Sequence, residues 1–314
     1  MTILLLSFLS LLFIPVPSET FLWRAVYNFG HVPLFGVVAI LLLWVSRVLF
    51  KSSAWPGLRH YGIALLGALV LALVTEVLQS LDVARESSVS DIVHDLIGAT
   101  CGLVLFFIFD KQLSGSWVQW RQFPRNVLLC VCVVLVLCFT LRPVVEWAYT
   151  YWDRAKRFPA LIDFSSDWEM KFVKEKDSEL SVVMPPEGWN HSSEDFVGRV
   201  TFYPKKYPGI FLQEPYPDWR GYTHLAFDVY SELSHPQTIA LRIDDLYYTN
   251  RYDDGFNRRV AILPGLNHIK IAIEDIRQAP LTRETDLSAM RKFLLFAKNP
   301  PEEFTLYFDN VRLE

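Results

Sequence analysis

Ionisable side chains recur at one level of an otherwise apolar region, and this is where chemistry or recognition is expected. They precede one apolar run, end the next and begin the one after it, with spacings of three and four residues in the last group. Burying such groups beside lipid is costly, so a functional role is the default interpretation. The polar cluster comprises His31, Glu76, Gln79, Arg85, Ser90, Asp91, His94 and Asp95.

Catalysis and simple helix capping are both alternatives for this cluster. General acid/base chemistry needs ionisable groups that converge on one point, and the sequence shows only that these groups share a depth. Ser90 and Asp91 are also good helix N-cap residues, so ordinary capping is an alternative for that pair. The sequence holds no Ser-His-Asp order, zinc signature or phosphate-binding loop. No catalytic residue is therefore assigned.

A second set of side chains, in the C-terminal half, has the chemistry of sugar recognition. Aromatic faces pack under pyranose C–H groups, while Asp, Asn and Arg side chains hydrogen-bond to the hydroxyls. Several of the aromatic residues are equally expected to pack between strands, which aromatic side chains favour. The candidate ligand-binding residues are Trp189, Tyr216, Trp219, Asp244, Asp245, Tyr247, Tyr248, Tyr252, Asp253, Asn257 and Arg258.

The two sets lie in halves of different composition. Residues 1–148 are mostly apolar, whereas residues 149–314 hold most of the charged side chains. The net charge of −4 and the lack of a basic stripe argue against a nucleic-acid partner. A membrane-spanning helix needs about 20 apolar residues. Five runs come close to that length: 2–16, 32–50, 61–81, 92–109 and 127–145. We expect the first to be a retained helix, with a cleaved signal peptide as the alternative.

Basic residues in the loops predict the orientation of these helices, because cytoplasmic loops carry an excess of Lys and Arg. The second and fourth loops are the basic ones, which places the N-terminus in the cytoplasm and everything after the fifth helix outside. The basic loop residues are Arg47, Lys51, Arg59, Lys111, Arg121 and Arg125. The polar cluster then faces the outer side, and membrane lipid is an expected partner.

Residues from about 160 onward change to the pattern of strands. Short alternating runs recur between turn signals such as Pro208-Gly209 and Pro264-Gly265, without helices between them. About ten strands are expected, including 168–173, 304–308 and 311–313, with an irregular or helical crossover over 274–291. This pattern predicts a β-sandwich of the jelly-roll kind. We therefore divide the chain into helices one to four with a cytoplasmic loop (1–125), a fifth helix and linker (126–158), and an extracytoplasmic β-sandwich (159–314).

The membrane half resembles the VanZ-like family over about residues 20–110. The resemblance is carried by Gly-His-Val-Pro-Leu-Phe-Gly (30–36), Thr-Glu-Val-Leu-Gln (75–79), Arg85 and Ser-Asp-Ile-Val-His-Asp-Leu-Ile-Gly (90–98). That family is named for a protein linked to resistance to the glycopeptide teicoplanin. It usually has Asn where this chain has Asp95, which adds a negative charge. The resemblance implies a bacterial cytoplasmic-membrane protein and a site, but no reaction.

The C-terminal half resembles carbohydrate-binding modules of the galactose-binding-like fold. The matching segments are Leu-Arg-Ile-Asp-Asp (241–245), Tyr-Asp-Asp-Gly-Phe (252–256), Pro-Gly-Leu-Asn-His-Ile-Lys-Ile (264–271) and Tyr-Phe-Asp-Asn-Val-Arg (307–312). The resemblance implies a structural calcium where the terminal strands meet, with Asp163 and Asp309 as ligands. Simple turn capping by Asp309 is an equal alternative.

Three functions follow in order of preference. The first is a membrane-anchored protein that binds an envelope glycan or a lipid-linked glycan. The second is a scaffold of an envelope-polysaccharide or glycopeptide-resistance system, in which the polar cluster only packs helices. The third is a membrane-surface enzyme that uses the His, Glu and Asp side chains of the cluster. The pattern leans away from an enzyme.

Overall fold

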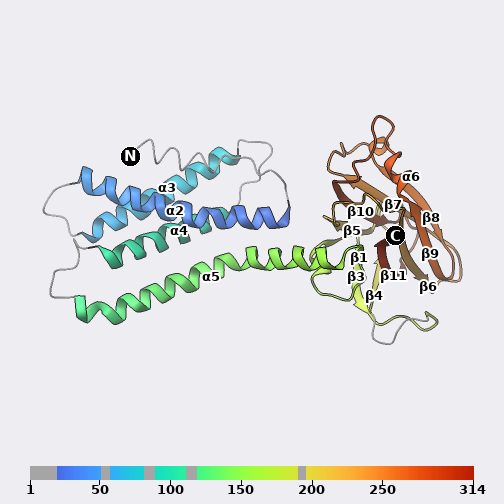
Figure 1. Ribbon diagram of the computed structural model, residues 1–314, viewed down its shortest axis with the longest axis horizontal. Helices are drawn as coiled ribbons and strands as arrows, with labels where there is room; N and C mark the ends of the chain where they lie inside the picture. The colour runs from blue at the N-terminus through green and yellow to red at the C-terminus, as the bar shows by residue number, and fades with distance from the viewer. Residues whose placement is uncertain (1–19, 51–56, 81–88, 111–118, 190–195) are drawn as a thin grey trace. The chain divides into compact units, whose positions relative to one another are not determined.

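The computed structural model describes residues 20–50, 57–80, 89–110, 119–189 and 196–314, without the side chains of Gln79 and residues 119–123 (Figure 1). The chain divides into two compact units, Met1–Tyr149 and Thr150–Glu314. We call them the helical unit and the β unit and describe each by itself.

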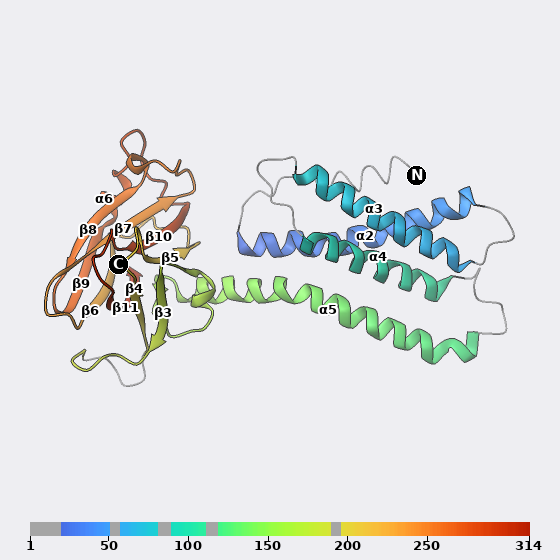
Figure 2. The same ribbon diagram turned by 180° about the vertical axis from the view of Figure 1, so that it is seen from behind.

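The helical unit is built on three helices that lie side by side in both views, α2 (Phe21–Leu49), α3 (Leu58–Ser80) and α4 (Val89–Phe109) (Figures 1 and 2). The longer α5 (Gln119–Arg157) follows them. All four are long and apolar enough to cross a membrane. They match four of the five predicted spans, and the first predicted run, residues 2–16, lies outside the described residues.

Small side chains let the three helices approach closely, as expected for helices that pack in lipid. The buried core of this bundle combines large residues from α2 with a column of alanines from α3. Its members are Phe35, Ala39, Leu43, Ala64, Ala68, Ala72, Ala99 and Leu103. The polar groups near both ends of the bundle are therefore held by a tightly packed middle.

The β unit contains two antiparallel sheets. The six-stranded sheet has the order β3 (Ser178–Val183), β4 (Val197–Phe202), β11 (Phe304–Leu313), β6 (His224–Ser231) and β9 (Gly265–Ala272), with β1 (Ala160–Ile162) paired to β11. The five-stranded sheet has the order β2 (Val173–Lys176), β5 (Gly209–Gln213), β10 (Met290–Phe296), β7 (Gln237–Asp245) and β8 (Phe256–Ile262).

Alternate side chains of the two sheets form the core of the β unit. Phe227 of the six-stranded sheet packs edge-on against Phe293 of the five-stranded sheet, and Leu241, Leu306 and Phe308 are fully buried. Strand alternation places the neighbours of these residues on the outer faces. This arrangement confirms the predicted β-sandwich, and it leaves each sheet with one outward face.

Three of the expected strands differ from the structure. The segment predicted as a strand over 168–173 is a 3-10 helix, Glu169–Lys171, and β2 begins only at Val173. The two strands predicted over 304–308 and 311–313 are the single β11, which bends at a register shift after Asp309, where Asn310 has φ 54. Asn tolerates this left-handed conformation better than most residues, so the strand continues instead of ending. The expected crossover contains a short helix, α6 (Ile273–Arg277).

Candidate functional site

The centre of the polar cluster in the helical unit is a buried pair between α2 and α4. His31 Nδ1 lies 2.8 Å from Asp95 Oδ1, and each side chain is only 3% exposed. The ring of Tyr27 meets the imidazole edge-on at 5.2 Å. A carboxylate that accepts from Nδ1–H leaves Nε2 as the nitrogen available to a further group. Nε2 is buried and has no hydrogen-bond partner in the described part of the chain.

The other described members of the predicted polar cluster are less buried than His31 and Asp95. Asp91, one turn before Asp95 on α4, and Glu76 of α3 are the other carboxylates that act electrostatically on Asp95. His94 Nδ1 bonds to the carbonyl oxygen of Ser90 at 2.7 Å, which is a local contact within α4. Arg85 and the side chain of Gln79 lie outside the described residues. The structure therefore brings His31 and Asp95 together and sets the other described members around them.

A second polar network, which was not predicted from the sequence, joins the same three helices at their opposite end. Tyr61 donates to Asp110 Oδ2 at 2.7 Å, and Arg47 pairs with the same carboxylate. Ser46 Oγ lies 2.7 Å from His60 Nδ1. The signal in the sequence is the position of these residues at the ends of three apolar runs. Arg47 served there only to predict the orientation of the helices. Each of its five members has a partner, so this network fits helix packing.

The outward face of the five-stranded sheet combines apolar and hydrogen-bonding side chains. Phe211 of β5, Leu294 of β10 and Arg242 of β7 are register partners in one row, and Phe296 lies in the next row. Phe211, Leu294 and Phe296 are partly exposed. Tyr207 meets the ring of Phe296 edge-on at 5.9 Å. These side chains form an aromatic and aliphatic stripe across the middle of the face.

Three of the predicted ligand-binding residues border this stripe. Asp244 accepts from Arg242 Nε at 2.9 Å, and the Arg242 guanidinium lies 4.2 Å from the centre of the Tyr248 ring. Asn257 is the register partner of Arg242 on β8. Burial raises the pKa of the Asp244 carboxyl, while Arg242 and Lys292 act in the opposite direction. We call the stripe and this border the sheet-face site.

The apolar part of the sheet-face site was not predicted from the sequence. Its signal is present in β10, where Phe293, Leu294, Leu295 and Phe296 form a continuous apolar run. A strand with one solvated face is expected to alternate instead. Periodicity does not tell which apolar residues of such a run face out.

Other predicted residues near β7 and β8 have structural partners. Asp245 is fully buried and accepts from Arg283 Nη2 at 2.8 Å and from the backbone of Asp286. Asp253 pairs with Arg251 at 2.7 Å. Arg258 points to the inward side and pairs with Asp275 at 2.7 Å. Arg251 lowers the pKa of Asp253 through a hydrogen bond.

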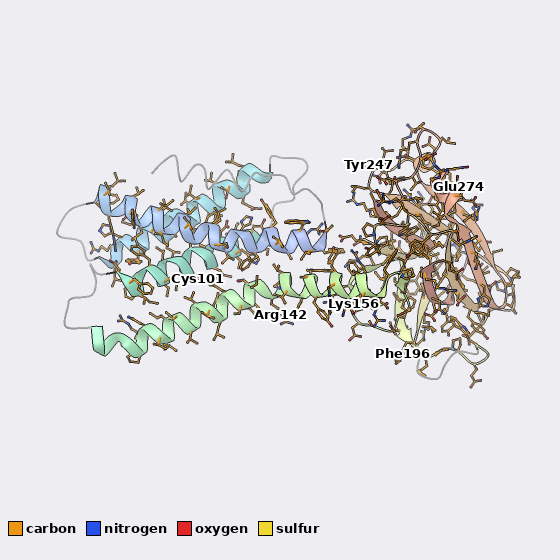
Figure 3. The ribbon with its side chains drawn as sticks, viewed as in Figure 1. Cys101, Arg142, Lys156, Phe196, Tyr247 and Glu274 are labelled. Carbon is orange, nitrogen blue, oxygen red and sulfur yellow. The ribbon has the colours of Figure 1, made fainter. Side chains whose placement is uncertain are left out.

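The loop after β7 carries the two predicted tyrosines that are most accessible. Tyr247 is 60% and Tyr252 is 78% exposed, and Figure 3 shows Tyr247 at the surface of the β unit. Asn257 Nδ2 donates to the carbonyl oxygen of Tyr252 at 3.0 Å, which fixes the end of this loop. Both rings are therefore available for contact with a ligand, beside the sheet-face site.

Three predicted aromatic residues lie elsewhere. Trp219 is 0% exposed and donates through Nε1 to the carbonyl oxygen of Tyr216, so its ring is not accessible to a ligand. Tyr216 stacks on Phe158 with ring centres 4.0 Å apart. Trp189 is buried against Tyr230 of the six-stranded sheet, on a different face from the sheet-face site.

The surroundings of the proposed calcium ligands meet only part of what a cation site requires. Calcium takes six to eight oxygen ligands, and no group of three or more His, Cys, Asp or Glu side chains is arranged to hold a metal in the described part of the chain. Asp163 does lie beside the buried Glu169, whose Oε2 has no hydrogen-bond partner among the described residues. Burial and Asp163 raise the pKa of Glu169 to about 8. Asp163 with Asp309 stays a prediction.

Comparisons with known proteins concern the β unit. No protein-family model and no curated protein matches the sequence. A family 11 carbohydrate-binding module from Clostridium thermocellum, solved with a β-1,3-1,4-mixed-linked tetrasaccharide, is 16% identical with a TM-score of 0.38, and the match covers 49% of this chain and 93% of that module. A family 30 module from the same organism is 14% identical with a TM-score of 0.35, covering 46% and 91%.

An exo-β-agarase structure is also similar, at 16% identity and a TM-score of 0.39. The match covers 49% of this chain but only 25% of the agarase, so the chain spans about a quarter of that enzyme's length. What the sheet-face site binds has to be argued from its own side chains.

Proposed function

We propose that this protein is a membrane-anchored, extracytoplasmic glycan-binding protein, and that its β unit binds an envelope or lipid-linked glycan at the sheet-face site. The observation that carries the proposal is the aromatic and aliphatic stripe of Phe211, Leu294 and Phe296 with Arg242 and other hydrogen-bonding side chains at its border. Binding sites typically combine an apolar lining with a few placed polar groups.

The chemistry of this site suits a sugar chain better than a purely apolar ligand. A pyranose ring offers C–H groups on its faces and hydroxyls at its edges. The rings of Phe211 and Phe296 can receive the C–H face, while Arg242, Asp244 and Asn257 supply donors and acceptors for hydroxyls. An extended face that crosses five strands, about 19 Å at 4.8 Å per strand step, fits a linear chain of several sugars.

The helical unit supports the anchoring part of the proposal. Four helices of the length and composition of membrane spans are present, and the loop charges favour an outward β unit. The VanZ-like resemblance of residues 20–110 agrees with a bacterial envelope protein. A second proposed role of the helical unit is to engage a lipid or lipid-linked molecule at the His31–Asp95 pair.

A scaffold function is the second candidate. It is favoured by the network of Arg47, Tyr61 and Asp110, in which all charges are paired inside the bundle. Such a network stabilises helix association and needs no ligand. Under this alternative the sheet-face site would contact a protein partner instead of a glycan.

Glycan binding is tested with the full-length protein in lipid nanodiscs on an array of envelope polysaccharides. The stripe variants Phe211→Ala and Phe296→Ala are compared with Leu266→Ala, which removes an exposed apolar side chain from the outward face of the other sheet. We expect the stripe variants to lose at least about tenfold in affinity, because removing a ring from a binding-site centre costs more than 1.4 kcal/mol, and Leu266→Ala to bind normally. Absence of wild-type binding to every glycan contradicts the proposal.

A further inference from the structure

The outward face of the five-stranded sheet, which contains the sheet-face site, carries an excess of positive charge. Register pairing puts five cationic side chains on the outward face of the five-stranded sheet and a single carboxylate, Asp244, among them. The cations are Lys174, Lys176, Arg242, Arg259 and Lys292. The whole chain has a net charge of −4, so this face is opposite in sign to the protein that bears it.

Most of this charge is not neutralised within the protein. Arg242 pairs with Asp244 at 2.9 Å, which accounts for the one carboxylate. Lys174, Lys176, Arg259 and Lys292 make no ion pair with any described residue of the chain. Lys292 is the register partner of Asp244 and acts on its carboxyl electrostatically without forming an ion pair. Four cations that make no ion pair among the described residues are therefore available to a ligand on one face.

The cations are placed on both sides of the apolar stripe. Lys174 and Lys176 lie on β2 at one edge of the sheet, Arg259 lies on β8 at the other edge, and Lys292 lies on the central β10. Lys174 is in register with Phe211, and Arg259 is in register with Ala240 beside Phe296. A chain that crosses the strands over the stripe would meet a positive charge at its beginning, middle and end.

The other outward face provides an internal comparison. The paired strands of the six-stranded sheet carry three cations and three carboxylates on that face: Arg199, Lys270 and Arg312, with Glu179, Asp228 and Asp309. Lys270 pairs with Glu314 at 2.6 Å, and Asp228 pairs with His268 at 2.6 Å. That face is balanced in charge and its described charges are mostly paired. The positive excess is thus a property of the outward face of the five-stranded sheet and not of the whole β unit.

We propose that the glycan bound at the sheet-face site is acidic, with carboxylate, phosphate or sulfate groups that Lys174, Lys176, Arg259 and Lys292 recognise. This inference rests on the proposed function, since it names the class of glycan for the same site. The stripe supplies contact with sugar faces, and the cations select a chain that carries repeated negative charge. Such complementarity acts mainly on specificity and association rate, and it weakens with salt.

The test compares acidic and neutral glycans on the full-length protein in nanodiscs of uncharged lipid. The carboxylate pair is polygalacturonate and its fully methyl-esterified form, which keeps the sugar chain and removes the charge. A teichoic acid and a sulfated galactan form the phosphate and sulfate arms and distinguish the source of the negative charge. A single-stranded DNA oligonucleotide tests whether any polyanion is sufficient.

We expect at least one acidic glycan to bind at least about tenfold more tightly than the neutral chain in 50 mM NaCl, with the preference reduced in 500 mM NaCl because the Debye length shortens. The triple variant Lys174→Ala, Lys176→Ala, Arg259→Ala should lose that preference. The matched pair Arg199→Ala, Lys270→Ala, which removes cations from the other face, should retain it.

The outcomes separate the two proposals. If neutral and acidic glycans bind equally, or the triple variant keeps its preference, the acidic inference is overturned while glycan binding stands. If DNA binds as tightly as the acidic glycan with the same loss in the triple variant, the face is a general polyanion surface and the inference is again overturned. If no glycan binds and Phe211→Ala changes nothing, the proposed function itself fails.

Discussion

A Cβ atom on Gly98 would lie 2.1 Å from the carbonyl oxygen of Val32, so α2 and α4 meet backbone to backbone at this point. One turn further along α4, a Cβ on Gly102 would lie 2.6 Å from the carbonyl oxygen of Gly36. Two small residues four apart are the usual means by which membrane helices approach closely. The His31–Asp95 pair lies next to this crossing, which explains how a short hydrogen bond forms between two helices.

Substitution of Gly98 should therefore loosen the helical unit. Gly98→Ala introduces a clash with backbone atoms, which cannot rotate away, and we expect a loss of about 1–3 kcal/mol in the stability of the bundle. Cys101 is 7% exposed on α4 (Figure 3) and reports opening through its rate of thiol labelling. The measurement uses a background without the other three cysteines.

Gly62→Ala is the control for this prediction. Nothing lies within 4 Å of a Cβ at Gly62, and alanine favours a helix by up to about 1 kcal/mol over glycine. We expect Cys101 labelling at the normal rate or slower. Equal labelling rates in the two alanine variants would contradict a backbone contact at Gly98.

The His31–Asp95 pair should show energetic coupling in a double-mutant cycle. Removing one partner leaves the other buried and unpaired, whereas removing both leaves neither. Hydrogen bonds between membrane helices average about 0.6 kcal/mol and reach about 1.7 kcal/mol. Because both side chains are 3% exposed, we expect His31→Ala and Asp95→Ala to couple by about 1–2 kcal/mol, measured by Cys101 labelling.

The same cycle on Ser46 and His60 provides a comparison with an uncharged partner. Ser46 Oγ lies 2.7 Å from His60 Nδ1 in the same bundle, and its coupling should be smaller because hydrogen bonds to charged groups are stronger. A coupling at His31–Asp95 no larger than this one would indicate that Asp95 is uncharged or that the pair is not formed.

Much of the architecture follows from the sequence because each half has a strong periodic signal. Apolar runs near 20 residues predict α2, α3, α4 and most of α5, and short alternating or β-branched runs predict most of the strands from β3 onward. The strand predictions fail where local side-chain contacts compete with the periodic pattern of apolar residues. Residues 168–173 have apolar and aromatic members at strand spacing, yet Glu169 takes part in a buried contact with Asp163 that suits a helical turn.

The sites were less predictable than the elements. His31 and Asp95 were both identified, but their pairing depends on the crossing of two helices 64 positions apart in the chain. In the β unit the sequence predicted Arg and Asp chemistry around β7 and β8, and the structure shows that Asp245 belongs to an internal cluster while Phe211 and Phe296 face outward. Which side of a strand faces out depends on tertiary pairing, which the composition of one strand does not determine.

Arg283 is predicted to be a main support of the loop that carries Tyr247 and Tyr252. Its guanidinium bonds to the fully buried carboxylate of Asp245 and to Asp254 Oδ1 at 2.6 Å. Arg283→Ala leaves the buried Asp245 without its cation, and breaking a buried pair from one side costs about 3 kcal/mol or more. Urea unfolding of the full-length protein, followed by tryptophan fluorescence of the β unit, measures this loss.

Arg277→Ala is the matched control for Arg283. Arg277 pairs with Glu274 at 2.6 Å and Glu284 at 2.8 Å, and both carboxylates are more than half exposed. Exposed pairs contribute little, so this variant should unfold at nearly the same urea concentration as the wild type. If both arginine variants lose the same stability, the internal cluster around Asp245 does not have the importance assigned to it.

Glu169 should make the stability of the β unit depend on pH. Burial, followed by the charge of Asp163, raises the pKa of its carboxyl from 4.5 to about 8. Between these values the folded protein holds a proton that the unfolded chain has released. The stabilising contribution is therefore complete below about pH 4.5 and is lost as the pH rises through about 8. Glu169→Gln cannot ionise and should flatten this part of the thermal-melting profile.

Calcium bound by Asp163 and Asp309, with Glu169 beside them, would reverse this trend, because a bound cation favours the ionised carboxylate. At pH 8, 1 mM calcium chloride should then raise the melting temperature of the wild type by several degrees, since a ligand that binds only the folded state stabilises it, and leave Glu169→Gln unchanged. The dependence of the melting temperature on pH tests the buried carboxyl of Glu169. The change in melting temperature on adding calcium tests the metal site. A steep slope without a calcium shift would retain the buried Glu169 proton and remove Asp163 and Asp309 as metal ligands.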